Sequence, residues 1–277
     1  MVELLKTHYT MQYIKYLMLG LYSILFSVSY AQIGGLSASK LGSFSVGVVP
    51  NNKIEFEPSF SHFRSKSYWD NDNNKQSIFS TSDSVRNISA MSFRFTYGLW
   101  DKMEIGVSVS PDVSMSSWGL RYIVCQQEKL GIAAITGMNI PLGNQTIDKK
   151  LRLADNLLSL GIGGVMTYDF SNNFSADFTA QYQFRLEETS HHDKNAMFFN
   201  LDFGYYILNH QLQFASGIAY RTVQDIQGNH NVFTITPGIT VETGEIFIIV
   251  LYAPFDIMGK NEVINNGFGF ALTLLFN

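Results

Sequence analysis

The stretch FSADFTAQYQFRL, from Phe174 to Leu186, has the clearest pattern in the chain. Apolar residues stand at every second position: Phe174, Ala176, Phe178, Ala180, Tyr182, Phe184 and Leu186. Polar residues stand between them: Ser175, Asp177, Thr179, Gln181, Gln183 and Arg185. Successive side chains of a β-strand point to opposite faces, so this period of two predicts a strand with one apolar and one polar face.

The same alternation recurs along the chain and divides it into twelve predicted strands. They cover residues 52–63, 86–100, 103–113, 116–126, 129–141, 157–170, 173–187, 196–208, 211–222, 231–242, 246–254 and 265–276. The connection after every second strand is tight. Most of the others are longer and polar, namely 64–85, 142–156, 188–195, 223–230 and 255–264. Short turns at one end and long loops at the other are typical of outer-membrane β-barrels.

Alternation alone leaves open which face of each strand is buried, because a soluble β-protein hides its apolar face and a membrane barrel exposes it to lipid. Charged residues are 15% of the chain, against about 25% in ordinary soluble domains. Aromatic residues near predicted strand ends, such as Trp100, Trp118 and Tyr205, are placed to form interfacial girdles. The last strand ends in Phe276-Asn277, and an aromatic final strand is common in outer-membrane barrels.

We therefore predict an all-β fold, an antiparallel transmembrane β-barrel of twelve strands, with fourteen as the alternative count. Its apolar face contacts lipid in the outer membrane of a Gram-negative bacterium. A soluble periplasmic β-protein is the alternative fold.

Net charge and cysteine content exclude several classes of protein. The formal net charge is −4, whereas a nucleic-acid-binding protein needs a basic surface. Cys125 is the single cysteine, so neither an intrachain disulfide nor a cysteine-based zinc site is available. We expect no cofactor.

The first residues have the pattern of a secretory signal. Lys6 and Lys15 precede an uncharged apolar run from Tyr16 to Val28. This run is shorter than the roughly 20 residues of a spanning helix and fits a signal-peptide core of about 7–15. Small residues precede a cleavage site after Ala31. We predict a signal peptide over residues 1–31, a lead-in or small plug over 32–50, and the barrel over 51–277. A buried N-terminal helix is the alternative for the first part.

Several segments carry a resemblance to a known family: IEFEPSFSHF at Ile54–Phe63, FRFTYGLWDKMEIGVSVSPDV at Phe93–Val113, GIAAITGMNIPLGN at Gly131–Asn144 and LSLGIGGVMTYDFSNNFSADFTAQYQF at Leu158–Phe184. Together they resemble the outer-membrane family named after the meta-pathway of phenol degradation, and more distantly the outer-membrane channels for fatty acids and aromatic hydrocarbons. The resemblance covers most of residues 50–277. It implies a transporter-like barrel for small apolar compounds, although this chain is shorter than the fatty-acid channels and lacks their long N-terminal hatch.

Catalytic and metal-binding patterns are weak. A hydrolase needs a nucleophile beside a histidine base that a third group orients. Ser61 and His62 are adjacent, so they point to opposite faces of a strand. A barrel enzyme would require another Ser–His pair within hydrogen-bond reach on the lipid-facing rim. His191-His192-Asp193 is predicted to be a solvated loop, and the run Asp70–Asn74 lacks the glycine and glutamate of a calcium loop. We predict neither a catalytic residue nor a metal site.

Function is therefore expected on the polar face, inside the barrel. The candidate lumen-lining residues are Arg94, Arg121, Asp177, Gln181, Gln183, Arg185, Asp202 and Arg221. They either line a path for passive passage or binding of a small solute, or pair across strands and stabilise the wall. Tyr68 and Trp69, in the first outer loop, are candidates for contact with a ligand or an envelope protein. A structural adaptor is thus the second hypothesis, and a lipid-modifying enzyme is the third.

Overall fold

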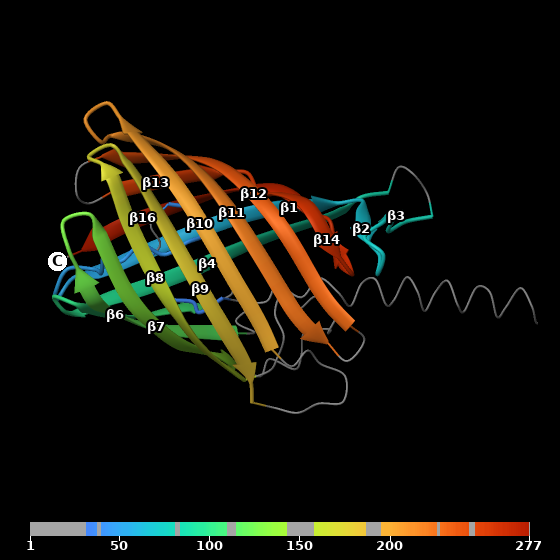
Figure 1. Cartoon of the computed structure of the whole chain (residues 1–277), viewed down its shortest axis with the longest axis horizontal. Coiled ribbons are helices and arrows are strands. Elements are labelled where there is room, and N and C mark those ends of the chain that lie inside the picture. Colours follow the sequence, from blue (N-terminus) through green and yellow to red (C-terminus); the bar gives the residue numbers. More distant parts are fainter. Residues whose placement is uncertain are drawn as a thin grey trace, which may run out of the picture.

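The computed structural model describes residues 32–37, 40–80, 84–109, 115–142, 158–186, 195–225, 228–243 and 247–276. Most of these residues lie in β-strands that wrap around a common axis (Figure 1). The described ranges contain no helix that is long and apolar enough to cross a bilayer. The predicted signal peptide and residues His191–Asp193 lie outside these ranges.

The strands form one closed antiparallel barrel. In chain order they are β1 (Ile54–Ser65), β4 (Arg86–Trp100), β5 (Met103–Val109), β6 (Met115–Gln126), β7 (Leu130–Pro141), β8 (Ser159–Ser171), β9 (Phe174–Arg185), β10 (Asn195–Ile207), β11 (Leu212–Asp225), β12 (Gly228–Thr243), β13 (Phe247–Tyr252), β14 (Phe255–Lys260) and β16 (Asn266–Phe276). Pairing of β1 with β16 closes the sheet. Because β13 and β14 share one position between β12 and β16, the barrel has twelve positions. The predicted count of twelve is confirmed.

Two of the predicted long loops are wrong. The strand expected to end at 254 breaks at Pro254, which has no N–H to donate to the ladder, and then resumes as β14. The neighbouring groups stay bonded: Ala253 donates to the Pro237 carbonyl at 3.0 Å, and the Pro254 carbonyl accepts from Gly267 at 3.0 Å. The loop expected at 223–230 is also mostly strand, because β11 and β12 stay paired up to Asp225 and Gly228.

The two faces of the strands divide as an outer-membrane barrel requires. The outward face is apolar, with Phe93, Phe95 and Phe270 exposed. On β9 the polar face points inward, and Asp177 and Thr179 are fully buried. Exposed aromatic side chains collect where strands meet the short turns, namely Trp100, Phe170, Tyr205 and Phe276. Such a belt marks one membrane interface.

A second, small sheet lies at the end of the barrel opposite the short turns (Figure 1). It consists of β2 (Ser67–Trp69), β3 (Lys75–Ser77) and β15 (Glu262–Val263). Trp69 is buried against Val232 and Ile264 and lies over Gly259. The expectation that Trp69 contacts a ligand or partner is therefore wrong, because its ring holds this sheet onto the barrel.

Candidate functional site

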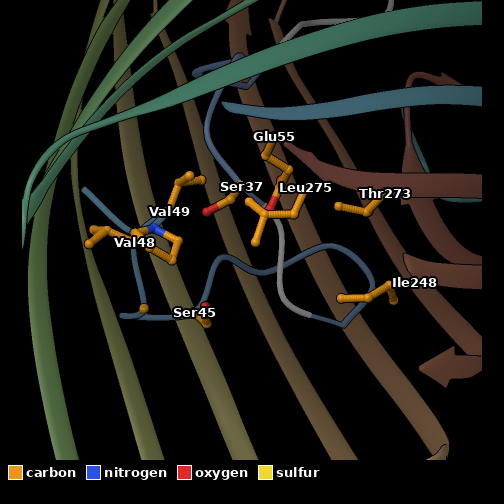
Figure 2. Close-up of a pocket in the computed structure, with 10 residues that line it drawn as sticks. Ser37, Ser45, Val48, Val49, Glu55, Ile248, Thr273 and Leu275 are labelled. Carbon is orange, nitrogen blue, oxygen red and sulfur yellow. The ribbon is translucent and has the colours of Figure 1, made fainter. Parts of the chain in front are cut away.

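Residues 32–37 and 40–50 lie inside the barrel, against the inner faces of β4 to β10. We call this stretch the inner segment; Figure 2 shows part of it in blue, crossing the interior. Glycines allow it to approach the wall closely. A side chain at Gly106 would overlap the backbone of Gly35, which itself has a φ of 81°. The positive φ is one that residues with a side chain rarely adopt.

One buried ion pair binds the inner segment at both Ser37 and Val49. Arg121 and Glu104 are fully buried and lie 2.7 Å apart. The Glu104 carboxylate accepts hydrogen bonds from the Ser37 N–H at 3.0 Å and from the Val49 N–H at 2.8 Å. The Arg121 guanidinium donates to the carbonyls of Ser37 at 3.2 Å and Ser45 at 2.6 Å. The pair therefore binds main-chain donors and acceptors of the inner segment together.

Two aspartates hold the middle of the inner segment. Asp202 Oδ2 accepts three consecutive backbone N–H groups, from Leu41 at 3.0 Å, Gly42 at 2.8 Å and Ser43 at 2.8 Å. Asp177 pairs with Lys40, with an N···O distance of 2.5 Å. Hydrogen bonds to a charged acceptor are stronger than those between neutral groups. The wall thus fixes this part of the segment through buried carboxylates.

The remaining candidates differ in what they contact. Arg94 donates to the Leu36 carbonyl, and Gln181 accepts from the Ile33 N–H at 3.0 Å. Gln183 donates to Ser159 on β8 at 2.7 Å, and Arg185 follows Gln183 on the same face of β9. Arg221 pairs with Glu262 at 2.7 Å, next to the small sheet. Arg94, Arg121, Asp177, Gln181 and Asp202 therefore all contact the inner segment. Gln183 bonds to β8, Arg185 follows it on β9, and Arg221 bonds to β15.

A cavity of about 210 Å³ separates the inner segment from the opposite part of the wall, formed by β1, β13 and β16. Its lining residues are Ser37, Ser45, Gly47, Val48, Val49, Pro50, Glu55, Ile248, Thr273 and Leu275. Figure 2 shows Ile248, Thr273 and Leu275 on the barrel wall, facing the segment that carries Val48 and Val49. The lining combines apolar side chains with the polar groups of Ser37, Ser45 and Thr273, and Glu55 is the ionisable group among the described lining residues.

Sequence reasoning left Ile248, Thr273 and Leu275 out of the inward-facing candidates. The alternation along β16 places Leu275 on the same face as Gly267, Gly269 and Thr273, so its inward position was available from the pattern. In contrast, β13 has the sequence FIIVLY, which is apolar at every position and shows no alternation. The inward position of Ile248 follows only from its pairing with Thr273.

A family model described as "Putative MetA-pathway of phenol degradation" matches residues 67–272, which is more than half of the chain. This chain belongs to that family. The family resemblance found in the sequence is thereby confirmed. No curated protein matches this family member.

Solved structures similar to this family member are outer-membrane channels and porins. The COG4313 outer membrane channel from Pseudomonas putida F1 matches with a TM-score of 0.66 and 12% identity, over 87% of this chain and all of that one. The NanC porin matches with a TM-score of 0.51 and 7% identity, over 79% of this chain and 98% of that one. The KdgM porin, in a complex with oligogalacturonate, matches with a TM-score of 0.50 and 5% identity, over 80% of this chain and 99% of that one. At these identities the likeness establishes the barrel fold.

This family member also carries a Ser–His pair on its outer surface. His62 on β1 and Ser89 on β4 are opposite each other in the sheet, and His62 Nδ1 lies 2.8 Å from Ser89 Oγ. The imidazole also packs on the ring of Phe268, with centroids 5.5 Å apart. Within the described ranges, no carboxylate or amide side chain is hydrogen-bonded to His62. The histidine and serine therefore lie as close together as in a hydrolytic site. Among the described residues, they lack the third group that would orient the histidine.

Proposed function

We propose that this protein is an outer-membrane channel through which a small solute passes passively, between the inner segment and the wall of β13 and β16. The observation that carries this proposal is the cavity. Buried polar side chains of β4 to β10, such as Glu104 and Asp202, are bonded to the inner segment, whereas the inner faces of β13 and β16 are left beside open space.

The wall beside the cavity suits a partly apolar solute. Moving away from the cavity along the inner face, Ile248 is followed by Val250 and Tyr252, and the residues paired with them on β16 are Thr273, Ala271 and Gly269. The ring of Tyr252 lies over Gly269, where a larger residue would collide with it. This wall offers few hydrogen-bonding groups, so an apolar solute is stabilised when it leaves water to contact it.

A flux measurement tests the proposal. The barrel is reconstituted into liposomes, and entry of small neutral and aromatic solutes is followed together with conductance in planar bilayers. Ile248→Trp places bulk in the cavity and should reduce flux several-fold. Ile162→Trp is the matched control, because Ile162 is 53% exposed on the outer face of β8, and flux through this variant should be unchanged. A folded wild-type barrel that passes neither ions nor solutes would sink the channel proposal.

We also propose that residues 1–31 are removed on export and that the inner segment is the resident N-terminus of the mature protein. The hydrogen bonds from Ile33 onwards support a fixed position for this segment. Terminal sequencing of protein purified from outer membranes should begin at Gln32. A purified protein whose sequence begins at Met1 would contradict removal of the signal peptide.

The pair of His62 and Ser89 makes a lipid hydrolase the second candidate. Both side chains stand on the face that contacts lipid, where an ester of a membrane lipid has access. Phospholipid hydrolysis by the purified barrel, abolished by Ser89→Ala, would favour this function. Absence of hydrolysis, with unchanged solute flux in Ser89→Ala, would leave the channel as the better account.

A further inference from the structure

The charges beside the cavity do not balance. Arg94 bonds to two carboxylates, Glu55 at 2.8 Å and Glu57 at 2.6 Å. Arg121 bonds to Glu104 at 2.7 Å. The charged groups that act on Glu55 are these same four residues. Among the described residues, two guanidinium groups therefore face three carboxyl groups in an interior that is largely shielded from water.

Glu55 is the carboxylate of this group that reaches the cavity. Figure 2 shows its side chain extending toward Ser37 and Leu275. Within the described residues, its hydrogen bond to Arg94 uses Oε1, so Oε2 is left available. Glu57 differs, because its Oε2 accepts from both Arg94 and Thr273. Glu104 differs as well, since it is fully buried and bonded to the inner segment.

The rest of the lining sets the size and polarity of a ligand. Val48, Val49, Ile248 and Leu275 give the cavity apolar walls. Its volume of about 210 Å³ exceeds the roughly 150 Å³ of a cavity known to hold benzene. It is smaller than the roughly 300–1,000 Å³ of pockets for drug-sized ligands. A ligand with one aromatic ring and a short polar substituent fits this space.

We propose that the cavity binds a small organic cation, with a ring-sized apolar body against Ile248, Leu275 and Val48 and a single ammonium group on Glu55. An ammonium supplies the missing positive charge and forms a charge-assisted hydrogen bond with the carboxylate. A carboxylate ligand is repelled there, and an alcohol leaves the charge unbalanced. This inference deepens the proposed function, on which its part in transport rests.

Equilibrium dialysis with three probes that share one ring tests the inference. Benzylamine, benzyl alcohol and benzoate are dialysed at pH 7 against the intact barrel in detergent micelles, and uptake by protein-free micelles is subtracted. Benzylamine should bind saturably and at least tenfold more tightly than the other two. Equal binding of the three probes, or no saturable binding above the micelle background, overturns the inference.

Three variants assign the binding to the cavity. Glu55→Gln should weaken benzylamine binding at least tenfold and leave benzyl alcohol unchanged. Glu128→Gln is the matched control, because it alters net charge equally in the exposed turn between β6 and β7; an equal loss in both variants would reveal a general charge effect and overturn the inference. Ile248→Phe fills the cavity and should weaken both probes. It keeps the inference testable if Glu55→Gln fails to give the heat-modifiable gel migration of a folded barrel.

The channel proposal and the cation-binding proposal can be overturned independently, because dialysis measures binding without transport. A barrel that binds benzylamine and passes no solute overturns the channel alone. A barrel that passes solutes without this binding overturns the inference alone.

Discussion

The two halves of the barrel interior have the same strand geometry and different contents. On β4 to β10, which form the polar half, the inner segment meets buried charged side chains such as Glu104, Arg121 and Asp202, together with an apolar cluster around Ile135 and Val165. On β13 and β16 the inward residues are apolar or small, and a cavity lies in front of them. The comparison shows how one closed sheet both immobilises its own N-terminal segment and keeps a space beside it.

The largest effect is expected where the polar half loses a buried charge. Arg121→Ala leaves Glu104 buried without its partner, and breaking such a pair costs about 3–5 kcal/mol. Urea unfolding of the barrel in detergent should show a loss of this size. Arg64→Ala, at an exposed position near the outer end of β1, should change stability by less than about 0.5 kcal/mol. Equal effects of the two variants would contradict the assigned role of the pair.

A smaller effect on stability, with a clear effect on conductance, is expected from Asp202→Asn. The amide keeps the shape of the side chain and loses the charge that holds three N–H groups. The amide oxygen still accepts, so each bond loses part of the roughly 1.5–3 kcal/mol of a hydrogen bond to a charged group, and residues 41–43 should detach more often. Single-channel recordings should show a several-fold rise in mean conductance. Unchanged conductance would mean that the segment stays in place by other contacts.

The apolar half is tested by a nearly isosteric change. Val250→Thr replaces one methyl group of the inner wall by a hydroxyl, and burial of such a group contributes about 0.8 kcal/mol. Flux of aromatic solutes should fall about fourfold, while ion conductance stays the same. An equal fall in both quantities would indicate a change in the barrel rather than in the apolar wall.

The smallest effect lies outside both halves, in the turn after β2. Hydrogen bonds from the Asn74 and Asp72 N–H groups and from Gln76 lower the pKa of Asp70 below its usual 3.8. A lowered pKa means that the ionised carboxylate stabilises the turn above about pH 4, and that this contribution is lost as pH falls through the folded-state pKa. Amide hydrogen exchange at Asn74 should therefore quicken on acidification. Asp70→Asn should remove the dependence on pH without altering the barrel.

The sequence predicted the barrel because a period of two, repeated along the chain, leaves few other folds. The predicted end of the strand at residue 254 was wrong, because Pro254 interrupts the hydrogen-bond ladder and the strand continues beyond it. The prediction also failed at β13, whose apolar residues on both faces hide the inward direction of Ile248. The inner segment was harder still. Its contacts join residues far apart in the chain, such as Ser37 with Glu104 and Leu41 with Asp202, and no local pattern encodes such pairings.

The wall holds the inner segment in two ways. It bonds to main-chain groups, such as the N–H groups of Ile33, Leu41 and Val49, and it forms a shared apolar cluster with the buried side chains of Ile33, Leu36, Phe44 and Val46. Main-chain groups are the same in every residue except proline. Positions of the segment that lie outside this cluster, such as Ser45 and Gly47, contribute main-chain groups or cavity lining and not buried apolar side chains. New side chains at Ser45 or Gly47, which line the cavity, can reshape it while the segment keeps its path, so the specificity of the barrel is adjustable from a few residues near its N-terminus.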